Sequence, residues 1–113
     1  SSIDKFKLED ENGNDLTDQI LHLQKVYLIF TYKPKEINYG AHPSEEIQKK
    51  LEMVAGKSPI YEISTEKSDL LGFQHLTMDG TAIKTIARSN PFVLVLKNGK
   101  IVEKKSLEDF LKH

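Results

Sequence analysis

Hydrophobic residues in the first 64 positions of the chain predict three β-strands. The run VYLIFTY at 26–32 is almost entirely β-branched or aromatic, which is typical of a strand buried on both faces at the centre of a sheet. Apolar and polar residues alternate at 5–9, which predicts a short half-buried strand, and PIYEIS at 59–64 predicts another. We therefore expect 26–32 to form the middle of the fold.

The last third of the chain predicts a hairpin followed by a helix. The apolar segments 92–96 and 101–102 flank the dipeptide Asn98-Gly99. Asn-Gly between two strands is the strongest short-range signal for a type I′ turn, because that turn needs positive φ at both central residues. Ser106 then opens Ser-Leu-Glu-Asp, which resembles a capping box with Asp109 in the place of Glu or Gln. We expect this box to start the terminal helix.

Helical periodicity fills the intervals between the strands. The clearest predicted helix is 44–55, which Gly56 terminates and whose apolar stripe consists of Ile47, Leu51, Val54 and Ala55. Shorter helices are expected at 16–23, at 70–76 and after 79–81. The resulting order is β-α-β-α-β-α-β-β-α. This order predicts an α/β fold with a central mixed sheet and helices on both faces.

Composition narrows the possible functions. The 113 residues, with 38% apolar and 29% charged positions, suit a single domain spanning 1–113 that folds without metal or disulfides. The net charge of -1 creates no long-range field, and Arg88 is the only arginine among 16 basic residues, so nucleic acid is not an expected partner. The absence of cysteine excludes disulfides, thiolate metal sites and cysteine nucleophiles. No apolar run approaches the roughly 20 residues that a membrane helix needs. Because the chain opens on Ser1, it is expected to be part of a longer protein.

The segment IARSNPFVLVLKNGKIV at 86–102 resembles the C-terminal half of thioredoxins, where a short helix leads through an X-Pro bond into a hairpin with a Lys-Asn-Gly turn. The resemblance implies a thioredoxin-like fold and a cis peptide bond between Asn90 and Pro91, beside the family's active site. In thioredoxins the redox cysteines follow the first central strand, and the matching segment 33–44 contains none. Without a thiolate nothing can attack a disulfide, so we expect no thiol-disulfide oxidoreductase activity.

A more specific resemblance involves two segments, FKLEDENGNDLTDQIL at 6–21 and IKTIARSNPFVLVLKNGKIV at 83–102. Together they are similar to a soluble C-terminal domain of DoxX-family membrane proteins, typical of the Bacteroidetes lineage. The resemblance implies a parent protein whose four-helix membrane part precedes this domain, with the cytoplasmic face of the membrane favoured. DoxX proteins are linked to quinone-associated redox and thiosulfate oxidation, but the matching motifs are not catalytic and assign no reaction.

The candidate binding cleft consists of residues around the expected cis-proline. The loop after the central strand contributes Tyr32, Lys33, Tyr39 and His42. The segment before the hairpin contributes Arg88, Ser89, Asn90 and Pro91. An extended peptide is expected to pair with the backbone there by β-augmentation. The plainer alternatives are a solvated loop, a turn shaped only by the proline, and an arginine that favours a helix C-terminus.

No catalytic, metal or cofactor site is predicted. The four histidines share no ligand spacing, and a trio of Ser68, His75 and Asp69 or Asp79 lacks a nucleophile elbow. We interpret the chain as a redox-inactive accessory domain that contacts a protein or peptide partner and the membrane segment of its parent protein. Two alternatives stay open. One is an enzyme that binds a glutathione-like thiol through Tyr32, Tyr39 or Ser89, and the other is a structural or oligomerisation module.

Overall fold

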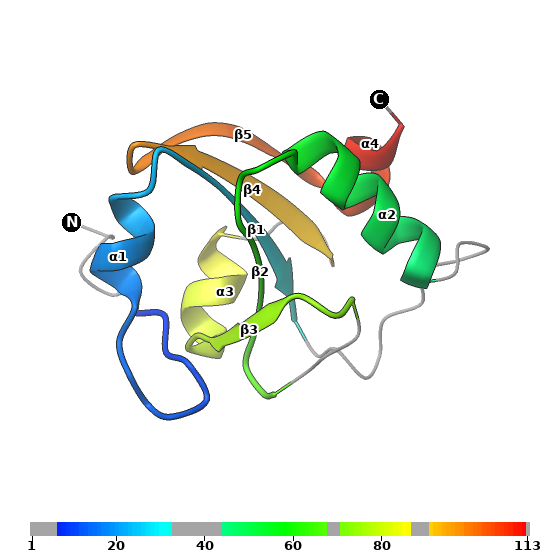
Figure 1. The fold of residues 1–113 in the computed structure, drawn as a ribbon. Coiled ribbons are helices and arrows are strands. Elements are labelled where there is room, and N and C mark those ends of the chain that lie inside the picture. Colours follow the sequence, from blue (N-terminus) through cyan, green and yellow to red (C-terminus); the bar gives the residue numbers. More distant parts are fainter. Residues whose placement is uncertain (1–6, 33–43, 68–70, 87–90, 113) are drawn as a thin grey trace.

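The computed structural model describes residues 7–32, 44–67, 71–86 and 91–112 (Figure 1). They form a five-stranded mixed sheet in the order β3-β2-β1-β4-β5, with helices on both faces, so the predicted α/β architecture is confirmed. The strands and helices are α1 (Thr17–Leu21), β1 (Lys25–Thr31), α2 (Ser44–Ala55), β2 (Ile60–Ser64), β3 (Gln74–Thr77), α3 (Gly80–Ile86), β4 (Phe92–Lys97), β5 (Lys100–Ser106) and α4 (Leu107–Leu111).

Strand β1 lies at the centre of the sheet, as its continuous apolar run predicts. It pairs in parallel with β2 on one side and antiparallel with β4 on the other. Every side chain from Val26 to Thr31 is buried. Because successive side chains of a strand point to opposite faces, β1 supplies apolar groups to both layers of helices.

Two hydrophobic clusters hold the helices against the sheet. On one face, Ile20 of α1 and Ile83 of α3 pack with Leu28 of β1. On the other face, α2 and α4 pack together, and the rings of Tyr27 and Phe110 meet edge to face with their centroids 6.0 Å apart. Burial of a large apolar side chain contributes about 1.5–3 kcal/mol. These contacts therefore stabilise the short helices, which are too short to persist alone.

The local signals at the end of the chain are confirmed. Asn98 and Gly99 have φ of 52° and 78°, the two positive angles that a type I′ turn requires. The hydroxyl of Ser106 accepts a hydrogen bond from the backbone N–H of Asp109 at 3.1 Å, which is the expected cap of α4. Gly56 follows α2 with φ of 60°, as expected of a terminating glycine.

One predicted helix, 70–76, is wrong. The chain instead forms β3, which extends the sheet parallel to β2. Gly72 has φ of 79°, outside the right-handed helical region. The apolar residues that suggested one helical stripe are buried on opposite faces of the sheet, Leu71 with α2 and α4 and Leu76 with α1 and α3.

Two further differences concern short segments. The strand expected at 5–9 is reduced, within the described residues, to isolated bridges from Glu9 to Asp15 and to Thr77, although Leu8 is fully buried as its apolar position implied. The described order therefore begins with α1 rather than with a strand. In α2, Val54 is 46% exposed because it falls outside the buried stripe formed by Ile47, Leu51 and Ala55.

Candidate functional site

The candidate site lies at the carboxyl-terminal ends of the parallel strands. β1, β2 and β3 run in the same direction, so the residues that follow them meet at one edge of the sheet. In open α/β sheets ligands bind at this edge, where strands end and helices begin. The antiparallel strand β4 starts at the same edge, because Phe92 is the register partner of Phe30. The edge thus brings together the residues after β1 and those before β4.

Tyr32 and Pro91 are the two predicted cleft residues that the structure describes, and both lie at this edge. Tyr32 follows β1, and Pro91 precedes β4, where its carbonyl accepts a hydrogen bond from the N–H of Leu107 at 3.0 Å. The remaining predicted members lie outside the described residues, as does the expected cis peptide bond, and are Lys33, Tyr39, His42, Arg88, Ser89 and Asn90. For these six residues, membership of the binding cleft stays a prediction.

The Tyr32 ring packs against the start of α3. The ammonium of Lys84 lies 4.7 Å from the ring centroid, within the range of a cation–π contact. Gly80 permits the close approach of this helix, because an added Cβ would lie 3.1 Å from Cγ2 of Thr65 and 3.6 Å from Cε2 of Tyr32. The carboxylate of Asp79 accepts the N–H of Thr81 at 3.1 Å and thereby caps the helix.

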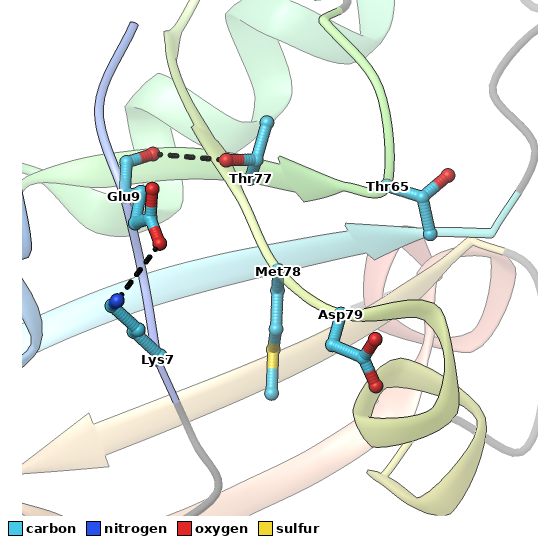
Figure 2. A pocket seen from close by; sticks show the side chains of 6 residues that line it. All are labelled: Lys7, Glu9, Thr65, Thr77, Met78 and Asp79. Carbon is cyan, nitrogen blue, oxygen red and sulfur yellow. Dashed lines mark hydrogen bonds and ion pairs between the residues drawn. The ribbon is translucent and has the colours of Figure 1, made fainter. Parts of the chain in front are cut away.

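Beside this contact lies a cavity of about 290 Å³ that the sequence did not reveal (Figure 2). It is lined by Lys7, Glu9, Thr65, Thr77, Met78 and Asp79. Met78 supplies an apolar surface, while an ion pair of 3.2 Å joins the ammonium of Lys7 to the carboxylate of Glu9. The N-terminal segment therefore forms one wall of a cavity whose other walls follow β2 and β3.

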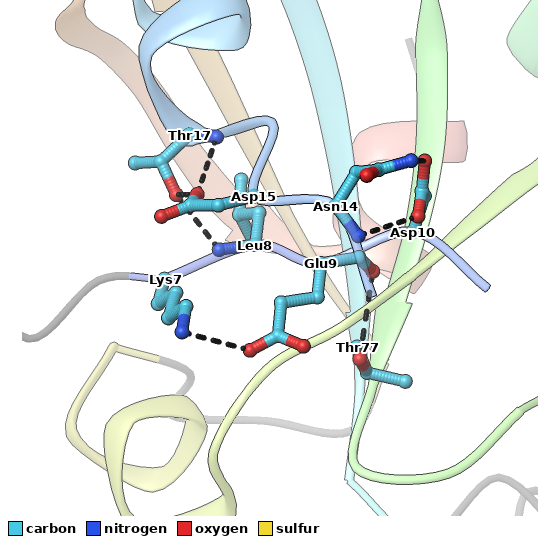
Figure 3. A network of polar contacts seen from close by, with 8 residues as sticks. All are labelled: Lys7, Leu8, Glu9, Asp10, Asn14, Asp15, Thr17 and Thr77. Atoms are coloured by element: carbon cyan, nitrogen blue, oxygen red, sulfur yellow. Dashed lines mark hydrogen bonds and ion pairs between the residues drawn. The ribbon is translucent and has the colours of Figure 1, made fainter. Parts of the chain in front are cut away.

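A network of polar contacts holds that N-terminal wall in place (Figure 3). The backbone N–H of Thr77 donates to the carbonyl of Glu9 at 2.8 Å, and the N–H of Leu8 donates to the hydroxyl of Thr17 at 2.9 Å. The backbone and side-chain amides of Asn14 donate to the carboxylate of Asp10 and hold its pKa below the ordinary value. These bonds fix a segment that makes only isolated strand bridges.

Hydrogen bonds from Thr17 likewise lower the pKa of Asp15, first through the hydroxyl and then through the backbone N–H. The Asp15 carboxylate thus accepts the first N–H of α1, although Leu16 formally precedes the helix without a side-chain cap. This contact makes Asp15 the side chain that starts α1.

A second polar group, also missed from the sequence, lies between β2 and β3. The carboxylate of Glu62, only 2% exposed, accepts the N–H groups of Leu71 and Phe73 at 3.0 Å each. The fully buried hydroxyl of Ser64 contacts Nε2 of His75. An alternating polar pattern in YEIS could have drawn attention to these positions, but it reads equally as an exposed strand face.

This Ser–His pair does not form a hydrolytic site. Ser64 has no exposed surface from which to attack a substrate, and its hydroxyl also donates to the carbonyl of Glu66 at 2.6 Å. Of the trio considered from the sequence, Ser68 and Asp69 lie outside the described residues. Within the described ranges, no three His, Asp or Glu side chains are grouped to hold a metal ion.

Comparison with known proteins identifies the fold. No protein-family model and no curated protein matches the sequence. Among solved structures, a thiol:disulfide interchange protein from Bacteroides sp. has a TM-score of 0.64 at 16% identity, covering 95% of this chain and 81% of the other. The thioredoxin domain of a thiol-disulfide oxidoreductase from Bacteroides vulgatus has a TM-score of 0.62 at 16% identity, covering 94% and 89%.

A third structure, an uncharacterized thioredoxin-like protein from Porphyromonas gingivalis, has a TM-score of 0.60 at 13% identity and covers 96% of this chain and 86% of that one. These similarities confirm the thioredoxin-like fold class that the sequence predicted. At such low identity they establish the fold alone. The chain combines this fold with a complete absence of cysteine.

Proposed function

We propose that this chain is a redox-inactive thioredoxin-like binding domain that contacts a protein or peptide at the Tyr32–Pro91 edge. One observation carries the proposal: the fold is that of thiol-disulfide oxidoreductases, yet the sequence contains no cysteine. Disulfide exchange begins with attack by a thiolate, which this chain cannot supply. Binding of a partner needs no thiolate and requires only a surface such as the Tyr32–Pro91 edge.

The described part of the edge offers contacts suited to an extended polypeptide. Tyr32 presents an amphipathic ring, and aromatic rings of this kind are enriched in protein interfaces. Lys84 contributes a cation beside the Tyr32 ring, and Asp79 contributes a carboxylate to the neighbouring cavity, which suits recognition of polar backbone and side-chain groups. Met78 adds a flexible apolar surface that adapts to different partners.

We further propose that the domain is attached to a DoxX-type membrane protein and lies on the cytoplasmic side. The support is the resemblance in the segments 6–21 and 83–102. Within the described part of the chain, no helix is long and apolar enough to cross a membrane. Under this proposal the membrane part belongs to the parent protein, and the domain binds either that part or a protein recruited to it.

Site-specific photo-crosslinking in the parent protein tests the binding role. A photoreactive phenylalanine analogue at Tyr32 should give a discrete adduct in intact membranes. The same analogue at Met53, which is 81% exposed on α2, is the matched control and should not give that adduct. Identical adducts from both positions, or disulfide reductase activity of the purified chain in an insulin assay, would contradict the proposal.

The second candidate function is binding of a glutathione-like thiol. The observation that favours it is the Tyr32 phenol beside the Lys84 ammonium at the Pro91 edge, since a phenol and a cation are groups that can stabilise a thiolate. Calorimetric titration with millimolar glutathione, compared between the natural chain and Tyr32→Phe, distinguishes it from peptide binding. Heat that depends on the Tyr32 hydroxyl would support it, and absence of heat would exclude it.

A further inference from the structure

Three lysines face one another across neighbouring strands at the end of the sheet opposite Tyr32. Lys25, at the start of β1, is the register partner of Lys97 in β4, which in turn is the partner of Lys100 in β5. All three side chains are exposed, and none makes an ion pair within the described residues. Like charges placed directly opposite one another destabilise a sheet. Lys25 has a partner in the ring of Tyr27, whose centroid lies 5.4 Å from its ammonium, but the placement of Lys97 opposite both other lysines is not explained by the stability of the domain.

Strand β5 extends this positive charge along an open sheet edge. It is the last strand in the sheet order, and no described residue pairs with its outer side. Lys104 is exposed and without an ion pair in the described chain, whereas Lys105 is neutralised by Glu103 at 2.8 Å. The surface formed by Lys25, Lys97 and the outer side of β5 is called the basic edge below.

The basic edge also exposes two neighbouring aliphatic side chains. Ile101 is 57% exposed and Val102 is 55% exposed. The β4–β5 register shifts at Val102, which has no partner on β4 and forms a β-bulge. Bulges redirect side chains at sheet edges. Here the bulge leaves an apolar pair in the chain between Lys100 and Lys104, neither of which makes an ion pair with another described residue.

We propose that the basic edge binds an extended acidic segment of a protein partner, which adds to β5 as a sixth strand. The unpaired backbone of β5 would supply main-chain hydrogen bonds, the usual source of affinity in strand addition. Lys100 and Lys104 pair with Lys97 and Leu94 of β4, three positions apart, so their side chains lie on opposite faces of the sheet. Carboxylates three residues apart in the segment would face these two lysines, and the two aliphatic residues between the carboxylates would cover Ile101 and Val102. The segment thus has two acidic residues that flank an aliphatic pair.

Charge and spacing favour this occupant over two others. A second copy of the chain would bring the same surplus of lysine to the edge and would be repelled. Because of the bulge, Lys100 and Lys104 span only three positions of β4, from Lys97 to Leu94, which is about 10 Å along a strand. An extended chain could contact cations that are spread along a strand. A layer of lipid headgroups would contact only the hairpin end, so the extended chain is the better fit.

This surface is independent of the Tyr32–Pro91 edge. Lys25 begins β1 and Tyr32 follows its end, so the strand separates the two sites. The two are also distinguishable in solution, because their backbone amides belong to different residues. Either site can therefore fail experimentally without affecting the other.

The test is an NMR titration of the 113-residue chain with a synthetic peptide in which two glutamates flank a pair of valines. Amide shifts should be concentrated in 100–106 and weaken as salt is added. Lys100→Glu with Lys104→Glu should weaken binding by about tenfold or more. Lys49→Glu with Lys57→Glu makes the same change in net charge at exposed positions that form no ion pair among the described residues, and it should leave the affinity unchanged. Lys100→Gln with Lys104→Gln serves as a milder pair if the reversal disturbs folding.

Several results would overturn the proposal. Equal binding of a peptide with glutamine in place of glutamate would exclude the charge contribution. Shifts confined to Tyr32, Thr65 and Asp79 would assign peptide binding to the other edge. Binding to phosphatidylserine vesicles without peptide binding would identify a membrane surface, and self-association in sedimentation experiments without peptide binding would identify a second copy. No binding at millimolar peptide would leave the lysines as edge protection alone.

Discussion

The hydroxyl of Ser64 lies 2.5 Å from Nε2 of His75, so a side-chain contact joins β2 to β3 in addition to their backbone pairing. Ser64 has one proton, which it donates to the carbonyl of Glu66. The contact with His75 therefore uses the N–H of the ring. Burial holds the pKa of His75 below its ordinary value, the nearby Lys67 lowers it further, and the Glu66 carbonyl opposes them.

Acidification should destabilise the domain through His75. Between the lowered folded pKa and the ordinary value of 6.5, the unfolded chain binds more protons than the folded one. The free energy of unfolding should therefore fall as the pH drops below 6.5, while above it the histidine is neutral in both states and contributes no slope. Urea unfolding across this range measures the slope. His75→Gln should flatten it, and an unchanged slope would contradict the assignment.

Replacement of Glu62 should cost more than replacement of a surface glutamate. Its carboxylate accepts two backbone N–H groups from the turn that precedes β3. Glu62→Ala leaves these donors without that partner and should lower the free energy of unfolding by about 3 kcal/mol. Glu62→Gln keeps an acceptor oxygen and should cost less. Glu52→Ala, on the exposed side of α2, is the control, and equal losses in urea unfolding would refute this role.

Gly99 and Gly13 form a matched pair for testing the hairpin turn. Both have positive φ, 78° and 81°, so alanine at either position should cost about 1 kcal/mol in backbone strain. At Gly99 an added Cβ would also lie 2.9 Å from the carbonyl oxygen of Leu21, whereas at Gly13 nothing lies within 4 Å. Gly99→Ala should therefore lower the thermal midpoint more than Gly13→Ala. Similar shifts would mean that the turn moves freely away from α1.

Removal of the Asp79 carboxylate should loosen α3. The side chain accepts the N–H groups of Thr81 and Ala82, so Asp79→Ala should cost about 1 kcal/mol of stability and Asp79→Asn much less. Hydrogen exchange of the α3 amides should accelerate in the alanine variant. If only global stability falls, with no local acceleration in α3, the capping explanation is wrong.

Sequence reasoning succeeded where a structure depends on adjacent residues. Asn98-Gly99 determines its own turn, and Ser106 reaches an N–H only three residues away. It failed at 70–76, because apolar spacing shows that residues are buried but not on which side of a sheet. Leu71 and Leu76 pack on opposite faces, and only the pairing of β3 with β2 separates them.

The location of the candidate site could be predicted from the sequence better than the residues that line it. The order of strands and helices placed Tyr32 and Pro91 at one edge, because β1 ends where β4 begins. The cavity was not foreseen, since Lys7 and Met78 are brought together by contacts between Glu9 and Thr77, which lie far apart in sequence. Glu62 was missed for the same reason, because its partners lie nine and eleven residues further along.

The position of β1 between β2 and β4 has a consequence for the dynamics of the chain. Its two neighbours come from separate parts of the sequence, since β2 follows β1 through α2 and β4 belongs to the C-terminal hairpin. The β4–β5 hairpin can close and reopen as a local unit, and β3 can detach as an edge strand. Because the β1 amides alternate between β2 and β4, release of all of them requires both flanking pairings to break, so the complete set should exchange with solvent deuterium only through global unfolding.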